Sequence, residues 1–314
     1  MILTADWHLK PESEKTVLEV LAALVKACHD LEDYTICVLG DVYHVRHQVP
    51  VALQNNLVDF LHNSDVNWVF ISGNHDQVDV AGRNALEVLG HLPNVEVYSA
   101  PEWASVDGVT IAMFPFRKEL SEYDEILNST PQYSGDAPIF AFLHHGIQGA
   151  KMNNHVVAGE GDGIPASNFA AFQTVFLGHW HRHQVVGNCV YVGSPWQTKA
   201  DEAGEAKGYI HLDDKTMKWT FHELRIGRRF WKDGMDLSEV SEGDRVSTAD
   251  ETLANDLREK GVEVIMEKVE EKYQARFALP PGATAREYAV KFVEERGGEL
   301  DPALLLEIFD EVTA

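Results

Sequence analysis

The chain has 314 residues, of which 50 are Asp or Glu and 26 are Lys or Arg, giving a formal net charge of −24. No apolar run approaches the roughly 20 residues of a membrane-spanning helix, so we expect no membrane segment. The strong negative charge excludes a chain that binds nucleic acid through a uniformly basic surface, because phosphate contacts depend on Lys and Arg.

A chain of this length can bury a large core and predicts about two domains. Cys28, Cys37 and Cys189 are an odd and scattered set. They lack metal-type spacing, and we expect no disulfide framework. Residues 1–5 begin directly as a strand, with no charged segment leading into an apolar one, so we expect a cytoplasmic protein.

Short apolar runs alternate with amphipathic helical patterns through the first half of the chain. Four runs predict buried strands because they are apolar and bounded by polar turns. They are residues 1–5, 35–39, 67–72 and 139–143. Leucines and valines at helical spacing predict helices around residues 17–25 and 53–61.

Later segments have the pattern of antiparallel hairpins. Asp107 and Gly108 occupy the turn of residues 104–114, and Gly187 and Asn188 occupy the turn of residues 185–192. Strands that alternate first with helices and then with hairpins predict an α/β fold, namely a four-layer αββα sandwich built on two mixed sheets.

Five short motifs occur in a fixed order, and four of them come directly after a predicted strand. Side chains at strand ends, on loops held by a rigid sheet, are where active sites of such folds usually lie. The motifs are Asp6-Trp7-His8, Gly40-Asp41-Val42-Tyr43-His44, Gly73-Asn74-His75-Asp76, Leu143-His144-His145-Gly146 and Gly178-His179-Trp180-His181.

The motifs contain enough nitrogen and oxygen ligands for two metal ions. A hydrolytic site with two divalent ions needs about three to four protein ligands per ion, with positions left open for water and phosphate. Seven side chains meet this requirement if one carboxylate bridges both ions: Asp6, His8, Asp41, Asn74, His144, His179 and His181. The alternate spacing of His179 and His181 places both on one side of an extended segment.

The order of the motifs resembles the calcineurin-like metallophosphoesterase superfamily, whose pattern is Asp-x-His, Gly-Asp, Gly-Asn-His, a single His and Gly-His-x-His. Within it, the chain is similar to SbcD-type DNA nuclease subunits. His44 stands where the nuclease branch has a second active-site histidine, and residues 191–208 are similar to the segment that follows the last motif of such subunits. The resemblance covers roughly residues 1–230.

The resemblance implies a role for each motif residue. Asp41 would bridge the two ions. Asp6, His8 and His181 would complete the ligands of the first ion. Asn74, His144 and His179 would complete those of the second ion. The family pattern selects His144 over its neighbour His145, because its histidine precedes one residue and then glycine.

Three further residues are candidates for catalysis. His75 follows the ligand Asn74 and is free to contact phosphate or to protonate the leaving group. Asp76 is expected to fix the tautomer of His75 by hydrogen bonding. The resemblance implies that His44 positions the scissile phosphate.

These assignments predict an exonuclease and endonuclease subunit that acts on DNA with two divalent ions. The mixed nitrogen and oxygen ligands favour Mn, with Fe, Zn or Mg as alternatives. The resemblance implies a homodimer and an SbcC-type ATPase partner with a coiled coil. The acidic charge favours an alternative, a stand-alone phosphoesterase acting on nucleotides or small phosphodiesters. A scaffold that keeps the metal site only for structure is a third class, disfavoured by the complete ligand set.

We expect three domains: a nuclease domain over residues 1–227, a small α+β cap over 228–280 and a helical hairpin over 281–314. In the hairpin, Thr284 with Glu287 forms a capping box, and Asp301 with Pro302 begins a second helix. Its apolar faces must be buried, either on the cap or, as the resemblance implies, on the ATPase coiled coil.

For the homodimer we considered two apolar segments. They carry Leu53, Leu57 and Leu61, and Leu86, Val88 and Leu89. The alternative is that these side chains face only their own sheet.

Overall fold

The computed structural model describes residues 1–45, 48–79, 83–129, 139–153, 156–267, 286–287 and 290–291. The chain divides into two units, Met1–Met266 and Glu267–Ala314. The C-terminal hairpin that we expected lies outside the described residues, apart from four of its positions. The three-domain division remains a prediction.

The first sheet holds four parallel strands and an antiparallel pair at its edge. Its order is β12-β11-β1-β2-β3-β4. The strands are β1 (Ile2–Thr4), β2 (Thr35–Leu39), β3 (Asn67–Ile71), β4 (Val95–Tyr98), β11 (Gly208–Asp213) and β12 (Lys218–Glu223). The predicted strands over residues 1–5, 35–39 and 67–72 are therefore confirmed.

The second sheet has antiparallel strands at both edges and four parallel strands between them. Its order is β5-β6-β7-β8-β10-β9. The strands are β5 (Glu102–Val106), β6 (Val109–Phe114), β7 (Phe140–His144), β8 (Thr174–Gly178), β9 (Gln184–Val186) and β10 (Cys189–Tyr191). Both hairpins have the predicted turns, because β5 pairs with β6 and β9 pairs with β10 antiparallel.

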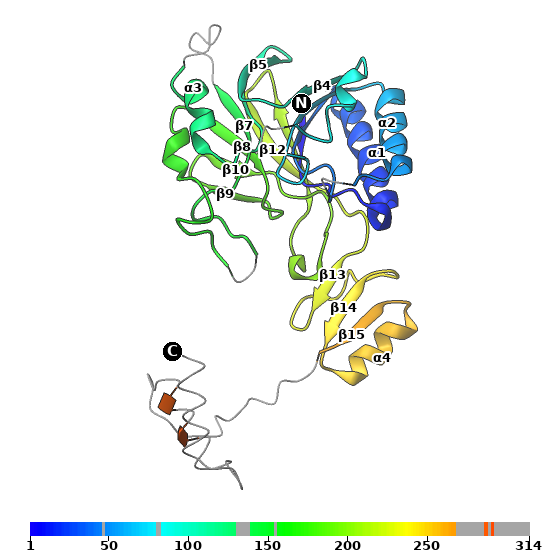
Figure 1. Ribbon diagram of the computed structural model, residues 1–314. Helices are drawn as coiled ribbons and strands as arrows, with labels where there is room; N and C mark the ends of the chain where they lie inside the picture. The colour runs from blue at the N-terminus through cyan, green and yellow to red at the C-terminus, as the bar shows by residue number, and fades with distance from the viewer. Residues whose placement is uncertain are drawn as a thin grey trace. The chain divides into compact units, whose positions relative to one another are not determined.

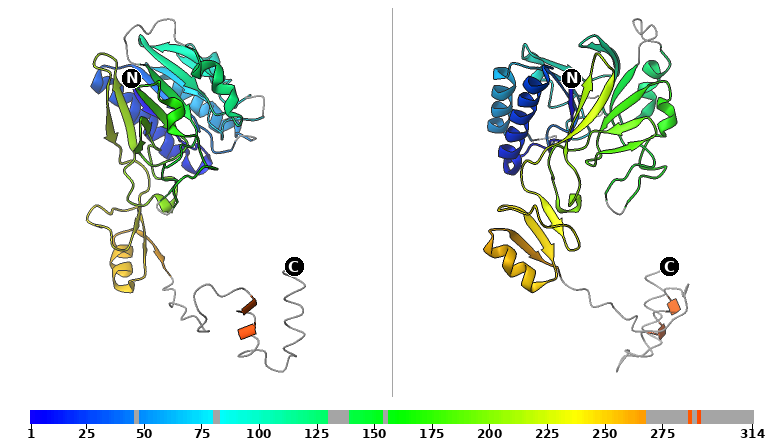
Figure 2. Two further views of the ribbon diagram at one scale, coloured as in Figure 1. Left: turned by 90° about the vertical axis from the view of Figure 1, so that its left-hand side faces the viewer. Right: turned by 180° about the vertical axis from the view of Figure 1, so that it is seen from behind.

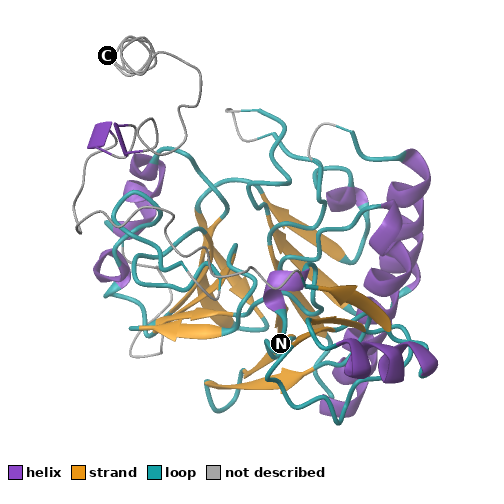
Figure 3. Ribbon diagram, turned by 90° about the horizontal axis from the view of Figure 1, so that it is seen from below, coloured by secondary structure: helices purple, strands orange, loops and turns teal. Residues whose placement is uncertain are grey.

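The two sheets pack face to face, and alternate residues of each strand point to opposite faces. In β2, Cys37 and Leu39 contribute to the core between the sheets, whereas Ile36 and Val38 face the helices. Phe142 of β7 and Phe176 of β8 fill the same inter-sheet core from the second sheet. Helices flank the sheets on both sides (Figure 3).

Helices α1 (Glu14–Leu31) and α2 (Val51–Asn63) cover the outer face of the first sheet (Figure 1). Short helical turns cover the outer face of the second sheet. They are α3 (Asp124–Leu127), η3 (Leu120–Tyr123) and η4 (Ala166–Phe169), and they bury Tyr123, Ile126 and Phe169. The predicted α/β sandwich is confirmed, with a thinner fourth layer than the first.

The segments that we considered for a dimer face are largely buried inside the chain. Leu53, Leu57 and Leu61 of α2 are at most 3% exposed and pack in the core under the first sheet. Leu86 and Leu89 are also fully buried, and only a 3-10 turn (Leu89–His91) forms there. The alternative, that these leucines face their own sheet, is therefore confirmed, whereas Val88 is 42% exposed and the homodimer stays a prediction.

A small third sheet lies beyond the sandwich (Figure 2). It contains β13 (Phe230–Lys232), β14 (Arg245–Thr248) and β15 (Glu263–Met266), all parallel, and α4 (Glu251–Glu259) packs on it. Asp250 caps α4 by accepting hydrogen bonds from the backbone of Thr252 and Leu253. Gln197 ties this sheet to the sandwich, because its Oε1 accepts a hydrogen bond of 2.6 Å from the Phe230 backbone.

No helix among the described residues has the length and apolar composition that crossing a bilayer requires.

Candidate metal centre

The carboxyl ends of five parallel strands, from both sheets, meet at one edge of the sandwich. β1, β2 and β3 end just before Asp6, Asp41 and Asn74, and β8 ends just before His179. His144 is the last residue of β7. This arrangement brings together motifs that are up to 175 positions apart in the sequence, from Asp6 to His181.

The backbone at this edge is strained. Seven non-glycine residues among those described have positive φ, and four of them are predicted ligands. They are Asp6 (55°), His8 (47°), Asp41 (56°) and His179 (92°). Side chains other than glycine rarely adopt this conformation, and such residues cluster at functional sites. All four side chains belong to the ligand set that meets at this edge.

Glycines of the motifs leave the room that the inward side chains need. A Cβ on Gly40 or Gly178 would collide with the His144 ring, and a Cβ on Gly73 would collide with the Asp41 carboxylate. Gly40 also has a φ of +88°. The glycines are therefore required by close packing around two of the predicted ligands.

One cluster of potential ligands consists of Asp6, His8 and His181. Their ligating atoms lie within 4.8 Å of one another. The Nε2 atoms of His8 and His181 are 2.8 Å apart, and the Asp6 carboxylate accepts hydrogen bonds from the His179 backbone N–H. Burial and the nearby His181 lower the pKa of His8 well below its usual value, so its ring is neutral.

A second cluster consists of Asp41, His144 and His179, again within 4.8 Å. Asn74 joins it, because its Oδ1 lies 3.1 Å from His144 Nε2 and 3.0 Å from His179 Nδ1. Burial and the nearby His144 lower the pKa of His179 to about 3. These clusters contain the same residues as the two shells implied by the sequence.

Asp41 lies between the clusters. Its Oδ1 is 3.3 Å from His144 Nε2, and its Oδ2 is 3.8 Å from His8 Nε2. Burial alone would raise the pKa of this carboxyl, but His144 and other nearby histidines hold it well below its usual range. The carboxylate is therefore ionised and has one oxygen directed to each cluster.

The His144 ring shows that this set fits a cation. Its Nδ1 donates a 2.6 Å hydrogen bond to the Leu39 carbonyl, so a neutral ring would present a bare Nε2 to the oxygens of Asn74 and Asp41. Acceptors facing one another need a positive charge between them. Although burial opposes it, Asp41 raises the pKa of His144 to about 9, so a proton takes this place when no metal does.

The spacing of the donor atoms also fits metal ligation. Ligands about 2.1 Å from one ion lie about 3.0 Å from each other at right angles and about 3.4 Å apart in a tetrahedron. The contact between His8 and His181 (2.8 Å) and the contacts of Asn74 with His144 (3.1 Å) and His179 (3.0 Å) are close to the right-angle spacing.

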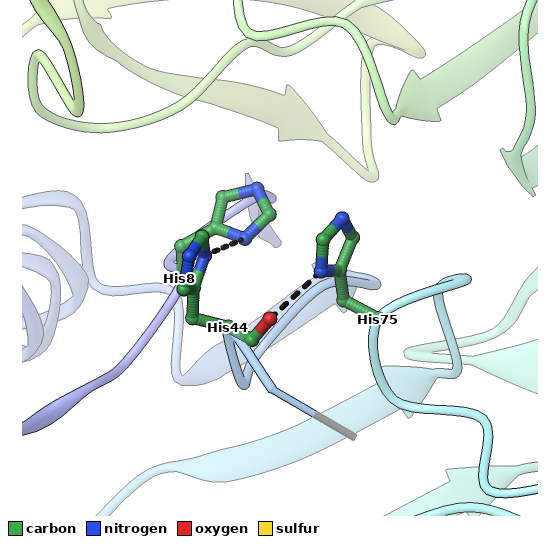
Figure 4. Close-up of side chains that lie close together, drawn as sticks. All are labelled: His8, His44 and His75. Carbon is green, nitrogen blue, oxygen red and sulfur yellow. Dashed lines mark hydrogen bonds between the residues drawn. The ribbon is translucent and has the colours of Figure 1, made fainter. Parts of the chain in front are cut away.

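His75 and His44 lie close to His8 (Figure 4), and the three histidines form a third group of possible ligands within 4.8 Å of one another. The Nδ1 of His75 donates a 2.8 Å hydrogen bond to the backbone carbonyl of His44. The Nδ1 of His44 lies 3.4 Å from the Nδ1 of His8. The carbonyl of His44 therefore holds the proton of His75 on Nδ1 and leaves Nε2 as the atom that exchanges protons.

Asp76 does not have the partner that we expected. Its carboxylate accepts hydrogen bonds from the backbone N–H groups of Asp41 (2.8 Å), Gly73 (2.9 Å) and Tyr43 (3.1 Å). The expectation that Asp76 fixes His75 is wrong, because these backbone donors occupy it and the His44 carbonyl takes the role. Burial and the nearby Asp41 raise the pKa of Asp76 to about 7.

His145 lies next to the second cluster, with its ring centroid 6.3 Å from that of His179, but it is not among the cluster's ligands. Its ring stacks on Phe116 with centroids 5.3 Å apart, and its Nδ1 lies 3.3 Å from the Gly146 carbonyl. The structure therefore brings His144 to Asp41, as the resemblance implied, and packs its neighbour against Phe116.

The clusters open into a cavity of about 380 Å³. Three cationic residues line it, Lys10, Arg182 and Lys199. Lys199 pairs with Asp201 at 3.3 Å, and Arg182 pairs with Glu205 at 3.8 Å. The cavity wall thus holds cationic side chains despite the net charge of the chain, but the acids that line it, Asp41, Asp201, Glu202 and Glu205, outnumber them.

Sequence reasoning assigned no role to the residues behind His181. Its Nδ1 lies 2.6 Å from Glu202 Oε1, and Glu202 also pairs with Lys207 at 3.0 Å. Both charged side chains are only 4% exposed. Burial alone would raise the pKa of Glu202, but His181 and Lys207 lower it to about 2. The only sequence feature that pointed to Glu202 was the acid-rich segment after Pro195. We had noted that segment for its resemblance to nuclease subunits and had given its residues no role.

Two named relatives are similar to the chain. "Exonuclease subunit 1" of Enterobacteria phage T4 is 26% identical over 189 residues, which cover 58% of this chain and 53% of the phage protein. The SbcD subunit of the SbcCD nuclease of Escherichia coli strain K12 is 27% identical over 254 residues, covering 67% of this chain and 63% of the relative. The chain thus matches less than two thirds of either relative's length.

A solved structure described as a novel archaeal phosphodiesterase aligns with 71% of this chain and 98% of its own. At 11% identity and a TM-score of 0.39, this likeness carries no argument. The family comparison is more decisive, because residues 1–183 match Calcineurin-like phosphoesterase and include all five motifs. Matched over more than half of its 314 residues, the chain belongs to the calcineurin-like phosphoesterase family.

Proposed function

We propose that this phosphoesterase is a nuclease that hydrolyses DNA phosphodiester bonds with two divalent metal ions. The observation that carries the proposal is the position of Asp41 between two ligand clusters that open into one cavity. Two relatives named as nuclease or exonuclease subunits support DNA as the substrate.

In this proposal Asp6, His8 and His181 hold one ion, Asn74, His144 and His179 hold the other, and Asp41 bridges them. The ions would lower the pKa of a water nucleophile and polarise the phosphate. Manganese suits the mixed imidazole, amide and carboxylate set, with Fe, Zn or Mg as alternatives.

The chain's own side chains supply positioning and proton transfer. His75 lines the cavity with its Nδ1–H held by the His44 carbonyl, so in its doubly protonated form it would give the Nε2 proton to the leaving oxygen and keep the one on Nδ1. The His44 ring lines the same cavity and orients the phosphate. Lys10, Arg182 and Lys199 attract the neighbouring phosphates of a strand.

An assay on three substrates tests the proposal: single-stranded DNA, duplex DNA with free ends, and bis-p-nitrophenyl phosphate, each with Mn²⁺. We expect hydrolysis of DNA by the wild type and none by an Asp41→Asn variant. Hydrolysis of the small ester alone, with no DNA cleavage, would contradict the nuclease assignment.

That outcome would favour a stand-alone phosphoesterase acting on nucleotides or small phosphodiesters. The net charge of −24 supports this second candidate, because a strongly acidic chain repels a polyanion. A basic partner would remove the conflict for DNA.

We propose an ATPase of the SbcC type as that partner, held by residues 281–314. The SbcD relative, named as one part of the SbcCD nuclease, supports a role within a complex. Deleting residues 283–314 should abolish co-purification with the ATPase and leave Mn²⁺-dependent hydrolysis of the small ester intact. A truncated chain that still forms the complex would place the contact elsewhere.

We also propose that the chain forms a homodimer, through residues other than the buried leucines of α2. Light scattering at micromolar concentration tests this proposal, and a monomer at that concentration would contradict it for the isolated chain.

A further inference from the structure

At the wall of the cavity, Glu202 is buried and contacts His181 directly. It closes a 3-10 turn, η5 (Ala200–Glu202), and its side chain is 4% exposed. Its Oε1 lies 2.6 Å from His181 Nδ1 and accepts a 2.7 Å hydrogen bond from the Thr198 hydroxyl. Its Oε2 accepts a 2.8 Å hydrogen bond from the Thr198 backbone N–H and forms an ion pair with Lys207 Nζ at 3.0 Å.

This arrangement fixes the position of the proton on His181. A carboxylate only accepts hydrogen bonds, so the ring atom 2.6 Å from it must carry the proton. A neutral His181 with its proton on Nδ1 has a lone pair on Nε2. That is the atom 2.8 Å from His8 Nε2, on the side of the proposed metal.

Lys207 contacts both Glu202 and His181. Its Nζ lies 3.0 Å from Glu202 and donates a 2.8 Å hydrogen bond to the backbone carbonyl of His181. Glu205 is a second carboxylate on Lys207, at 3.1 Å. Glu205 alone can therefore balance the charge of Lys207. An ion pair between Glu202 and Lys207 that served only the fold would not explain why Glu202 also contacts His181.

We infer that Glu202, supported by Lys207, is a positioning residue that holds His181 with its proton on Nδ1 and directs Nε2 to the metal. The inference rests on the proposed function and deepens it. Outer partners of this kind orient ligating histidines, and their loss costs about 10- to 100-fold in metal affinity.

The variant Glu202→Gln has a specific effect on the ring. Its amide must place the carbonyl oxygen toward either His181 or the two donors on the other side, Thr198 N–H and Lys207. The ammonium and the backbone N–H together favour the oxygen, so the NH₂ group turns toward His181. An NH₂ group donates, and it therefore favours the tautomer with the proton on Nε2, which blocks metal binding.

Glu205→Gln is the matched control. Glu205 is also buried, at 5% side-chain exposure, and also contacts Lys207, but its described ion pairs are with Lys207 and Arg182. The control removes the same charge from the same cation and leaves the Glu202 contact to His181 in place.

The experiment measures the ring and the metal separately. ¹⁵N NMR of the histidine rings in metal-free, full-length protein should show His181 protonated on Nδ1 in the wild type and the Glu205→Gln control, and on Nε2 in Glu202→Gln. Calorimetry with Mn²⁺ should show a 10- to 100-fold weaker site in Glu202→Gln only.

The outcomes separate the two claims. A wild type that binds no Mn²⁺ would overturn the proposed function. A wild type that binds Mn²⁺, with Glu202→Gln binding equally well, would overturn the positioning role. The wild-type spectrum needs no variant to fold, and a His181 proton on Nε2 in that spectrum would also overturn it.

Discussion

The Nε2 atoms of His8 and His181 lie 2.8 Å apart, although 173 positions separate the two residues in the sequence. Each nitrogen belongs to a different sheet's strand-end loop, one after β1 and the other after β8. Two ring nitrogens this close either share one hydrogen bond or would ligate one cation. The following predictions separate the residues that would hold a metal ion from those that would act on the substrate.

Replacing Asp41 by Asn should remove both metals and all activity. The variant keeps the shape of the side chain but removes the charge that faces both clusters, at His144 and His8. Mn²⁺ calorimetry measures the loss, and Asp30→Asn, an exposed acid on α1, serves as the charge control. Two ions bound with unchanged affinity would contradict the bridging assignment.

His75→Ala should lower turnover by about 10²- to 10⁴-fold and leave both metals bound. The ring forms a third group of possible ligands with His8 and His44, but it is absent from the Asp6–His8–His181 and Asp41–His144–His179 clusters, and its Nδ1 is occupied by the His44 carbonyl. Single-turnover cleavage of DNA, whose alkoxide leaving group needs a proton, tests this with metal content measured on the same sample. A fall in metal content would show that His75 is itself a ligand.

The sequence predicted the strands correctly because short apolar runs bounded by polar turns are typical of buried strands. It also predicted that the motifs would meet, because four of the five follow the end of such a strand. It could not assign Asp76, because adjacency to His75 suggested a side-chain partner. In fact the tight turns after β2 and β3 expose backbone N–H groups that need an acceptor. Glu202 was missed because its contact to His181 crosses 21 positions of irregular chain.

The sequence also left open what covers the apolar face of α2. The spacing of Leu53, Leu57 and Leu61 establishes one apolar helical face and nothing about its partner. Their burial against the first sheet could be learned only from the packed structure.

Asp76→Asn should destabilise the protein and weaken metal binding without abolishing chemistry. One Asp76 oxygen accepts from Asp41 and Gly73, and the other accepts from Tyr43. An amide that keeps the first pair turns its NH₂ group against the Tyr43 N–H. Such a buried unpaired donor costs about 1–3 kcal/mol.

Urea unfolding measures the stability of Asp76→Asn, and activity should recover at high Mn²⁺ concentration because the residue acts through the Asp41 loop. A variant of wild-type stability that stays inactive at saturating Mn²⁺ would instead assign Asp76 to the chemistry.

The last prediction concerns pH and the metal-free protein. The pKa of His144 is raised from 6.5 to about 9 in the folded chain, chiefly because the ionised Asp41 outweighs burial. A group whose folded pKa is raised stabilises the fold fully below its unfolded pKa, and this stabilisation is lost as pH rises through the folded value. The window is therefore pH 6.5 to about 9, and the loss is on the order of 3 kcal/mol. His8 and His179, whose pKa values are lowered, act only below that window.

Urea unfolding in EDTA at intervals across the window measures this contribution as the difference between wild type and His144→Gln, in which titrations cancel except those of Asp41 and Asp76, whose charges interact with His144. The wild type should lose its advantage as pH rises. With saturating Mn²⁺ in both samples, the folded wild type has no proton on His144 to lose, so the slope of the difference across the window should disappear. A metal-free difference that is flat from pH 6.5 to about 9 would show that the folded ring is neutral, and that Asp41 does not hold a proton on it.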